Sequence, residues 1–402
     1  MWIAILIFAL TYLALAIGRV PGLRLDRTGA AIVGASLMIA SNALTLRDAY
    51  AAIDYETIAL LFGMMIVVAN LRFSGFFALV SAWVVEHAHR PITLLGSIVL
   101  TSGILSAFFV NDTVCLALTP LVIDVMRRLG RNPVPYLLAL AMASNAGSVA
   151  TITGNPQNMM IGSFSSIGYA QFAAVLAPVA AVSLIVTTAV IAFVYRAEFF
   201  RLAVVDVKHE PVRVNRGLLV KSLTVAAAML AAFFAGWPSS KAALLAGAVL
   251  LLTRRIKPER VYREIDWSLL ALFVGLFVVI AGVERTSFPD ALFSAASRFH
   301  LDRAVPMSLF SAALSNLVSN VPAVLIFKPF VSRLADPTHA WLVLAMSSTL
   351  AGNLTILGSV ANLIVTQRAR PDVHIGFWEY AKTGIPVTVL TLAAGVLILG
   401  LH

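Results

Sequence analysis

Four short polar segments interrupt otherwise apolar stretches of this sequence, and they hold the residues that could do chemistry. Residues 109–113 (FVNDT) and 317–322 (LVSNVP) each lie in the middle of an apolar stretch. Residues 144–158 and 347–362 are rich in Gly, Asn, Ser and Thr, which interrupt helices. Backbone that is broken at membrane depth is tolerated only inside protein or beside a water-filled cavity. Its free carbonyl groups bind cations and its helix N-termini attract anions, so the four segments predict a binding site.

The candidate residues are mostly Asn, Ser and Thr, which bind ions without placing an unpaired charge in the membrane. Substrate binding is predicted for Asn111, Thr113, Asn155, Asn158, Ser319, Asn320, Asn353, Thr355 and Asn362. Cation coupling, with H⁺ or Na⁺ as the coupling ion and no other cofactor, is predicted for Asp112, Asn111, Thr153, Gly154, Asn320 and Gly358. Asp112 is the one acidic residue that we place deep in the membrane, where a carboxylate is costly and usually functional.

Each segment also has a structural interpretation, because Asn, Asp, Ser and Thr are the residue types that cap helix N-termini. One segment alone fits either interpretation, whereas four at matching places favour a binding site. Asp54 and Asp266, which begin two apolar spans, are interpreted as structural. Lys328, inside an apolar hairpin arm, is expected to extend its ammonium group to the outer surface.

The composition requires a membrane environment for these segments. Of the 402 residues 60% are hydrophobic and only 12% are charged, and the mean hydropathy is +0.92. A soluble protein of this length could not cover so much apolar surface. The net charge of +10 does not indicate nucleic-acid binding, because the basic residues are scattered between apolar spans. The single cysteine, Cys115, excludes an intramolecular disulfide, and neither a metal site nor an enzyme motif is present.

The sequence contains an internal duplication. Residues 54–63 resemble residues 266–275, and the stretch from Ser106 through Asn111 to Pro120 resembles the stretch 315–329. Residues 138–142 resemble residues 342–346, and an asparagine, Asn158 or Asn362, lies sixteen residues after the methionine that ends each stretch. Three matches in the same order indicate a repeated unit.

The predicted fold is an all-α polytopic membrane protein made of two inverted repeats of five transmembrane helices, each with a re-entrant hairpin and a broken helix. The first repeat covers residues 1–196, with its hairpin at 92–130 and its broken helix at 135–165. Residues 197–217 form a cytoplasmic connector. The second repeat covers residues 218–402, with its hairpin at 304–334 and its broken helix at 340–367.

The basic residues predict the orientation. With an odd number of crossings per repeat and the N-terminus outside, 22 of the 29 Lys and Arg residues, Arg27 among them, lie at cytoplasmic ends. This bias is typical of a multi-pass protein of a bacterial inner membrane, with both termini outside. It does not depend on how deeply the hairpins enter the bilayer.

The polar segments resemble those of the ion-transporter superfamily, which includes arsenite permeases, NhaD-type Na⁺/H⁺ antiporters, citrate permeases and divalent-anion symporters. Residues 109–120 are similar to the Asn-Asp hairpin of the arsenite and NhaD branches. Residues 151–158 are similar to the Gly-x-Pro-x-Asn break of the anion permeases, and 352–362 to the matching break. The resemblance implies that the hairpin tips and breaks form the site on a domain that moves against a scaffold of outer helices.

The predicted function is a secondary active carrier of a small anion or oxyanion, driven by H⁺ or Na⁺ and working by alternating access. The alternatives are a Na⁺/H⁺ antiporter and an arsenite efflux permease. The predicted partners are the lipid bilayer and the substrate, and the apolar surface is also compatible with a homodimer. When the halves are aligned, Asp112 matches Val321, so the coupling ion is expected at the first hairpin.

Overall fold

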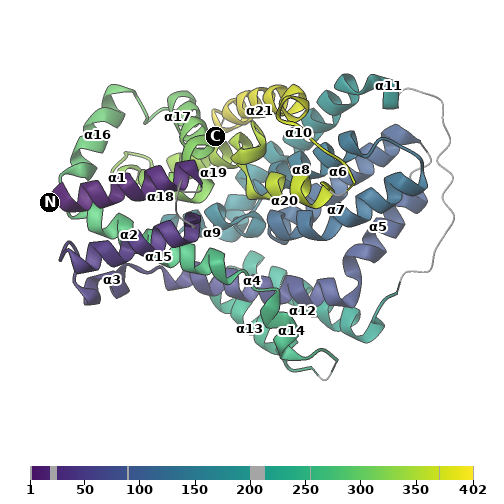
Figure 1. Cartoon of the computed structure of the whole chain (residues 1–402), viewed down its shortest axis with the longest axis horizontal. Helices are drawn as coiled ribbons and strands as arrows, with labels where there is room; N and C mark the ends of the chain where they lie inside the picture. The colour runs from purple at the N-terminus through teal and green to yellow at the C-terminus, as the bar shows by residue number, and fades with distance from the viewer. Residues whose placement is uncertain are drawn as a thin grey trace.

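The computed structural model of the chain describes residues 2–18, 25–87, 90–199, 213–253, 255–370 and 372–401, and these residues form helices without strands (Figure 1). Six of the described helices are long and apolar enough to cross a membrane. The predicted all-α polytopic class is therefore confirmed.

The helices of the first half follow the predicted order. They are α1 (Trp2–Ile17), α2 (Arg27–Ala40), α4 (Tyr55–Ser74), the hairpin α6 (Pro91–Phe108) and α7 (Asn111–Arg128), the broken helix α8 (Pro133–Ser148), η1 (Ile152–Gly154) and α9 (Pro156–Ser165), and α10 (Tyr169–Val194).

The second half repeats this order. It contains α12 (Arg216–Phe234), α13 (Ser239–Leu251), α15 (Trp267–Glu284), the hairpin α17 (Ala304–Val318) and α18 (Asn320–Val331), the broken helix α19 (Pro337–Ala351), η2 (Ile356–Gly358) and α20 (Val360–Ala369), and α21 (Phe377–Leu399). The connector at 197–217 lies largely outside the described residues, and its cytoplasmic location stays a prediction.

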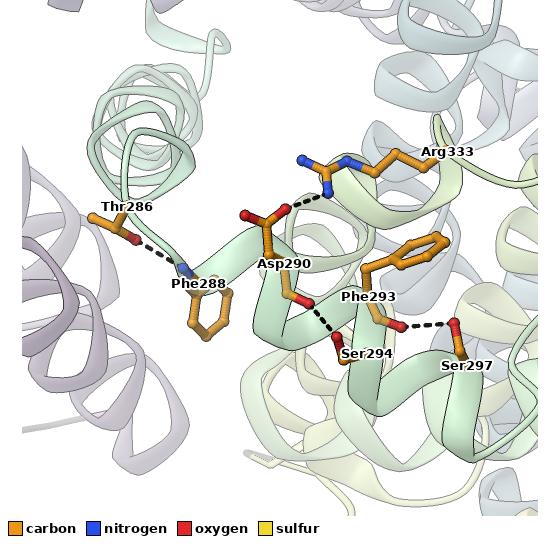
Figure 2. Close-up of polar contacts among 7 residues, drawn as sticks. All are labelled: Thr286, Phe288, Asp290, Phe293, Ser294, Ser297 and Arg333. Carbon is orange, nitrogen blue, oxygen red and sulfur yellow. Dashed lines mark hydrogen bonds and ion pairs between the residues drawn. The ribbon is translucent and has the colours of Figure 1, made fainter.

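Two helices join the third helix of each half to its hairpin, namely the apolar α5 (Phe76–His87) and the amphipathic α16 (Phe288–Arg298). Three short helices in the connections were not predicted: α3 (Leu46–Ala52), α11 (Arg196–Phe199) and α14 (Pro258–Arg263). Figure 2 shows how α16 holds the second hairpin, because the carboxylate of Asp290 accepts a 2.7 Å hydrogen bond from Arg333. The ring of Phe293 also packs 6.0 Å from that of Phe330 on α18.

Local sequence explains where the third helices begin. The Asp54 carboxylate accepts hydrogen bonds from the backbone amides of Glu56 and Thr57 at the start of α4. The Asp266 carboxylate accepts one from Leu269 at the start of α15. Both side chains satisfy amides that have no partner within their helix, so their interpretation as structural residues is confirmed.

The packing between the halves is reciprocal. Helix α2 of the first half packs on α15 of the second, and α4 packs on α13. A Cβ atom on Gly275 would approach the backbone of Ala31 to 2.8 Å, and one on Gly63 would approach that of Ala243 to 2.4 Å. Each close contact thus has a counterpart 212 residues along the chain, as an approximate two-fold relation between the halves requires. Figure 1 shows α1 entering the molecule from one end and α12 from the other.

Two groups of helices result from this packing. The scaffold group contains α1, α2, α4, α12, α13 and α15, which contact one another. The site group contains the hairpins, the broken helices, α10 and α21, with α10 packed on α21 and on α8. In Figure 1 the site group extends across the upper part of the molecule, from α17 and α18 at the left to α6 and α7 at the right, and much of the scaffold group lies at the left and below. The tips and breaks lie where the two groups meet.

Candidate substrate and cation site

The hairpin tips start helices without a side-chain cap. Helix α7 begins at Asn111 after Val110, and α18 begins at Asn320 after Ser319, with no capping hydrogen bond from either preceding side chain. Ser319 adopts a φ of +81°, a conformation that costs a residue other than glycine about 1–3 kcal/mol and that clusters at functional sites. The polar side chains of both tips are thus available for other contacts.

One asparagine holds each break together. The Asn158 amide donates 3.1 Å hydrogen bonds to the carbonyl groups of Ser148 and Thr151. Asn362 donates in the same way to Gly352, at 2.7 Å, and to Thr355, at 3.1 Å. Both side chains are fully buried. The carbonyl groups left free by each interruption are therefore satisfied by a side chain rather than by water.

Asn145, at the end of α8, connects the two halves. Its carboxamide oxygen accepts 3.0 Å hydrogen bonds from the Asn111 amide and the Ser359 hydroxyl. Its amide donates to the carboxamide oxygens of Asn353, at 2.9 Å, and Asn362, at 3.1 Å. All four of its hydrogen-bonding positions are used, so the first hairpin tip is fixed to the break of the second half.

Thr349, the residue that aligns with Asn145, makes the reciprocal connection. Its hydroxyl accepts 3.2 Å hydrogen bonds from the amides of Asn155 and Gln157, which belong to the break of the first half. The second tip joins this network through Asn320. In the amide orientation that satisfies both ends, Asn320 donates to the carbonyl groups of Ser348 and Gly358 and accepts from Gln157.

A cavity of about 90 Å³ lies between the tips, the breaks and the scaffold group. Four of the predicted site residues line it: Asn111, Asp112, Ser319 and Asn320. Gln157 and Ser359 of the breaks add polar residues to the lining, and Arg27 adds a basic residue from the start of α2. The remaining lining residues are Leu15, Pro156, Leu269, Leu272, Val321, Pro322 and Val360. The Asp112 carboxylate lies near the backbone amide of Ala361, at the start of α20. The lining of this cavity thus includes two charged residues, Arg27 from the scaffold group and Asp112 from the first hairpin tip.

The remaining candidates of the first half lie around the cavity rather than in it. Thr113 is one position further into α7 and is half-buried. Asn155 is the N-cap of α9 and accepts a 2.9 Å hydrogen bond from the amide of Asn158. The Thr153 hydroxyl is 2.8 Å from that of Tyr169. Gly154 ends η1 so close to α8 that a Cβ atom would lie 2.1 Å from the Ser148 carbonyl oxygen.

The remaining candidates of the second half have equivalent positions. Asn353 donates a 3.1 Å hydrogen bond to the carbonyl group of Met142, and Thr355 donates to the side chain of Asn316 at 3.3 Å. Gly358 lies against the same Asn316 side chain. These residues position the breaks, and their predicted part in binding stays a prediction.

Sequence reasoning missed Arg27, Asn145, Gln157 and Ser359 as individual site residues. The last three lie in or beside the predicted breaks, so the sequence indicated their segments but not which side chains in them make the contacts. Arg27 resembles any basic residue at the end of a span, and nothing in the sequence distinguishes it. Lys328 lies 3.6 Å from the Glu284 carboxylate and 5.0 Å from the centre of the Phe164 ring, which gives its ammonium group a partner at the end of α15.

The fold and the site define a class, a polytopic membrane transporter with paired hairpins and broken helices. The family described as "Citrate transporter" matches residues 12–351, so the chain belongs to that family. A crystal structure of the Alcanivorax borkumensis YdaH transporter, described as having an unusual topology, has the same fold with a TM-score of 0.59. It is 16% identical and covers 100% of this chain and 96% of that one.

Relatives with similar sequences are transporters as well. An uncharacterized transporter of Mycobacterium tuberculosis is 32% identical over 100% of this chain and 98% of its own length. A silicon efflux transporter of Oryza sativa subsp. japonica is 28% identical over 95% of this chain and 94% of its own length. The chain is therefore a multi-pass membrane transporter of the anion-permease type and not an enzyme.

Proposed function

We propose that this protein is a cation-coupled carrier of a small oxyanion or oxygen-rich weak acid in a bacterial inner membrane. The observation that carries the proposal is Asp112, a carboxylate at the junction of both tips and both breaks. The surrounding carboxamide and hydroxyl groups supply donors and acceptors for oxygen atoms of a substrate. The silicon efflux relative and the citrate transporter family both support a substrate rich in oxygen.

Asp112 couples the ion to the substrate in this mechanism. An ionised carboxylate inside the membrane costs several kcal/mol unless a cation or proton neutralises it. The site therefore crosses the membrane more readily with H⁺ or Na⁺ on Asp112 than with a bare carboxylate. The site group, with its two tips and breaks, moves against the scaffold group and exposes the cavity to alternate sides.

Transport into proteoliposomes tests this proposal. Uptake of citrate, phosphate, arsenite and silicic acid is measured with an imposed proton or Na⁺ gradient, for the wild type and for Asp112→Asn. The gradient-driven transport rate of the variant should be lower than that of the wild type by a factor of about 100 or more, because its neutral amide neither binds nor releases a proton. Asp124→Asn is the matched control, since it makes the same change on the same helix at an exposed side chain paired with Arg128.

Two results would contradict the proposal. One is gradient-driven uptake in Asp112→Asn at the wild-type rate. The other is the absence of uptake of all four probes by the wild type, combined with Na⁺-driven proton flux that needs no other substrate. The second result would identify the protein as a Na⁺/H⁺ antiporter.

A further inference from the structure

The scaffold group presents two related surfaces to the site group. The first dock consists of the scaffold residues of the cavity described above: Leu15 on α1, Arg27 on α2, and Leu269 and Leu272 on α15. The second dock lines another cavity, of about 190 Å³, which also touches Ile152 and Tyr169 of the site group. It consists of Phe233 on α12, Ser239 on α13, and Glu56, Thr57 and Leu60 on α4.

The 212-residue offset relates the docks residue by residue. It is the offset of the paired close contacts at Gly63 and Gly275. At this offset Thr57 corresponds to Leu269 and Leu60 to Leu272, so the α4 wall of the second dock corresponds to the α15 wall of the first. At the same offset Arg27 corresponds to Ser239, and Glu56 corresponds to Ser268. The docks thus share corresponding positions on α2 and α13 and on α4 and α15 but differ in charge, with a cation at the first and a carboxylate at the second.

Both hairpin tips face the first dock, where Arg27, Asn111 and Asp112 have unused binding capacity. No ion pair or hydrogen bond joins the Arg27 guanidinium to any residue in the part of the chain that the structure describes. The Asn111 side chain is only 4% exposed, and its carboxamide oxygen has no partner there either. The Asp112 carboxylate lies near the Ala361 amide. A cavity lined by an unpaired arginine, an aspartate and a free amide oxygen suits an oxyanion that arrives with a proton or cation.

We propose that Arg27 binds the negative charge of the substrate, and does so only while the site faces the first dock. This inference rests on the proposed function and adds the sign of the substrate and a preferred side. When the site faces the second dock, Ser239 and Glu56 replace Arg27, and Glu56 repels an anion. Under the orientation predicted from the basic residues, the first dock faces the cytoplasm, so the asymmetry favours binding inside and release outside.

Binding by the full-length protein in detergent, and transport in proteoliposomes, test Arg27. The probes are phosphate and citrate, which are anions at pH 7, and silicic acid and arsenite, which are neutral there. Arg27→Gln should weaken binding of the anionic probe, and raise its KM, at least about tenfold, because a charge-assisted hydrogen bond is lost. Arg27→Lys should recover part of the affinity. Lys241→Gln, which removes an exposed charge at the start of α13, should match the wild type.

The side preference has its own test. In vesicles of known orientation, the anionic probe should half-saturate at a lower concentration from the first-dock side. The combined change Glu56→Gln and Ser239→Arg should reduce that difference.

The outcomes separate the two proposals. Wild-type affinity for the anionic probe in Arg27→Gln, or transport of only the neutral probes by the wild type, overturns the role of Arg27 and leaves the carrier intact. The absence of any binding or transport by the wild type overturns the carrier and the inference together. Size-exclusion chromatography confirms that the variants are folded before either conclusion is drawn.

Discussion

The break in the first half and the break in the second are held by the same side chain in the same way. Asn158 and Asn362 each donate to two carbonyl groups, ten and seven residues earlier in the chain. The hairpin tips of the same two halves differ, because Asp112 in one corresponds to Val321 in the other.

The docks show the same contrast, because corresponding helix positions carry different charges. Arg27 corresponds to Ser239, and Glu56 corresponds to Ser268, although the helices around them match. Features common to both halves maintain the backbone, and features present in one half supply the charges. This separation is useful because each half provides a control for the other.

The largest effect is expected where the first half packs backbone against backbone. A Cβ atom on Gly147 would lie 2.1 Å from the carbonyl oxygen of Gly103, between α8 and α6. Gly147→Ala must therefore separate the hairpin from the broken helix, at a cost of at least about 3 kcal/mol. We expect little folded protein in size-exclusion chromatography.

Ala351, the residue that aligns with Gly147, already carries a Cβ atom. Ala351→Gly is thus the matched change in the second half, and it should cost only about 1 kcal/mol. Equal yields of the two variants would show that the halves do not differ in this contact.

The next effect concerns the paired asparagines. Asn158→Ala and Asn362→Ala each leave two buried carbonyl groups without a partner, which should cost about 2–4 kcal/mol in unfolding free energy. Thermal unfolding followed by tryptophan fluorescence measures both. Asn362→Ala should also slow transport more, because its oxygen accepts from Asn145 while that of Asn158 has no partner in the described chain. Because of this extra hydrogen bond, Asn362→Ala should cost at least as much stability as Asn158→Ala. A clearly larger loss in Asn158→Ala would contradict the equivalence of the breaks.

Much of the fold follows from short-range features of the sequence. Apolar runs of suitable length, and Gly, Asn and Pro clusters at fixed spacing, determine where α8 and α19 end and where α9 and α20 begin. The duplication adds information, because the sequence of each half independently predicts the same order of helices. The short helices α3, α11 and α14 were missed because they are too brief to show a periodic pattern.

The partners of the site residues did not follow from the sequence. Asn145 binds Asn353 and Asn362, more than 200 residues away, and its spacing resembles that of any Asn near a break. Arg27 shares its position at a span end with other basic residues, and only packing brings it to the cavity. Residue type and local breaks are encoded locally, whereas the choice among several similar polar partners is made by tertiary packing.

Two ion pairs at the edges of the site group give smaller effects and a further comparison. In the first half, Arg131 and Glu198 are 2.9 Å apart with side chains 12% and 21% exposed. In the second, Arg333 and Asp290 are 2.7 Å apart but 45% and 76% exposed (Figure 2). Double-mutant cycles on unfolding should give a coupling of about 1.5 kcal/mol for the first pair and under about 1 kcal/mol for the second. Only the second should vanish in high salt, and the reverse order would refute this ranking.

The smallest effect is a dependence on pH at the junction of the halves. The Arg285 guanidinium, helped by the Thr45 hydroxyl, lowers the pKa of Asp48 to about 2 from its ordinary value near 3.8. Because the folded protein holds this carboxylate ionised below the pKa of the unfolded chain, the pair stabilises at pH 7 and loses its contribution as pH falls from about 4 to about 2. Wild type should therefore unfold at a slightly higher temperature than Asp48→Asn at pH 7, and the difference should disappear near pH 2. Asp336→Asn, at the exposed N-cap of α19, is the control. Its effect on the unfolding temperature should be the same in the wild type and in Arg285→Gln, whereas the effect of Asp48→Asn should shrink in Arg285→Gln. A difference between wild type and Asp48→Asn that persists unchanged at pH 2 would mean that Asp48 acts through packing of α3 and not through its charge.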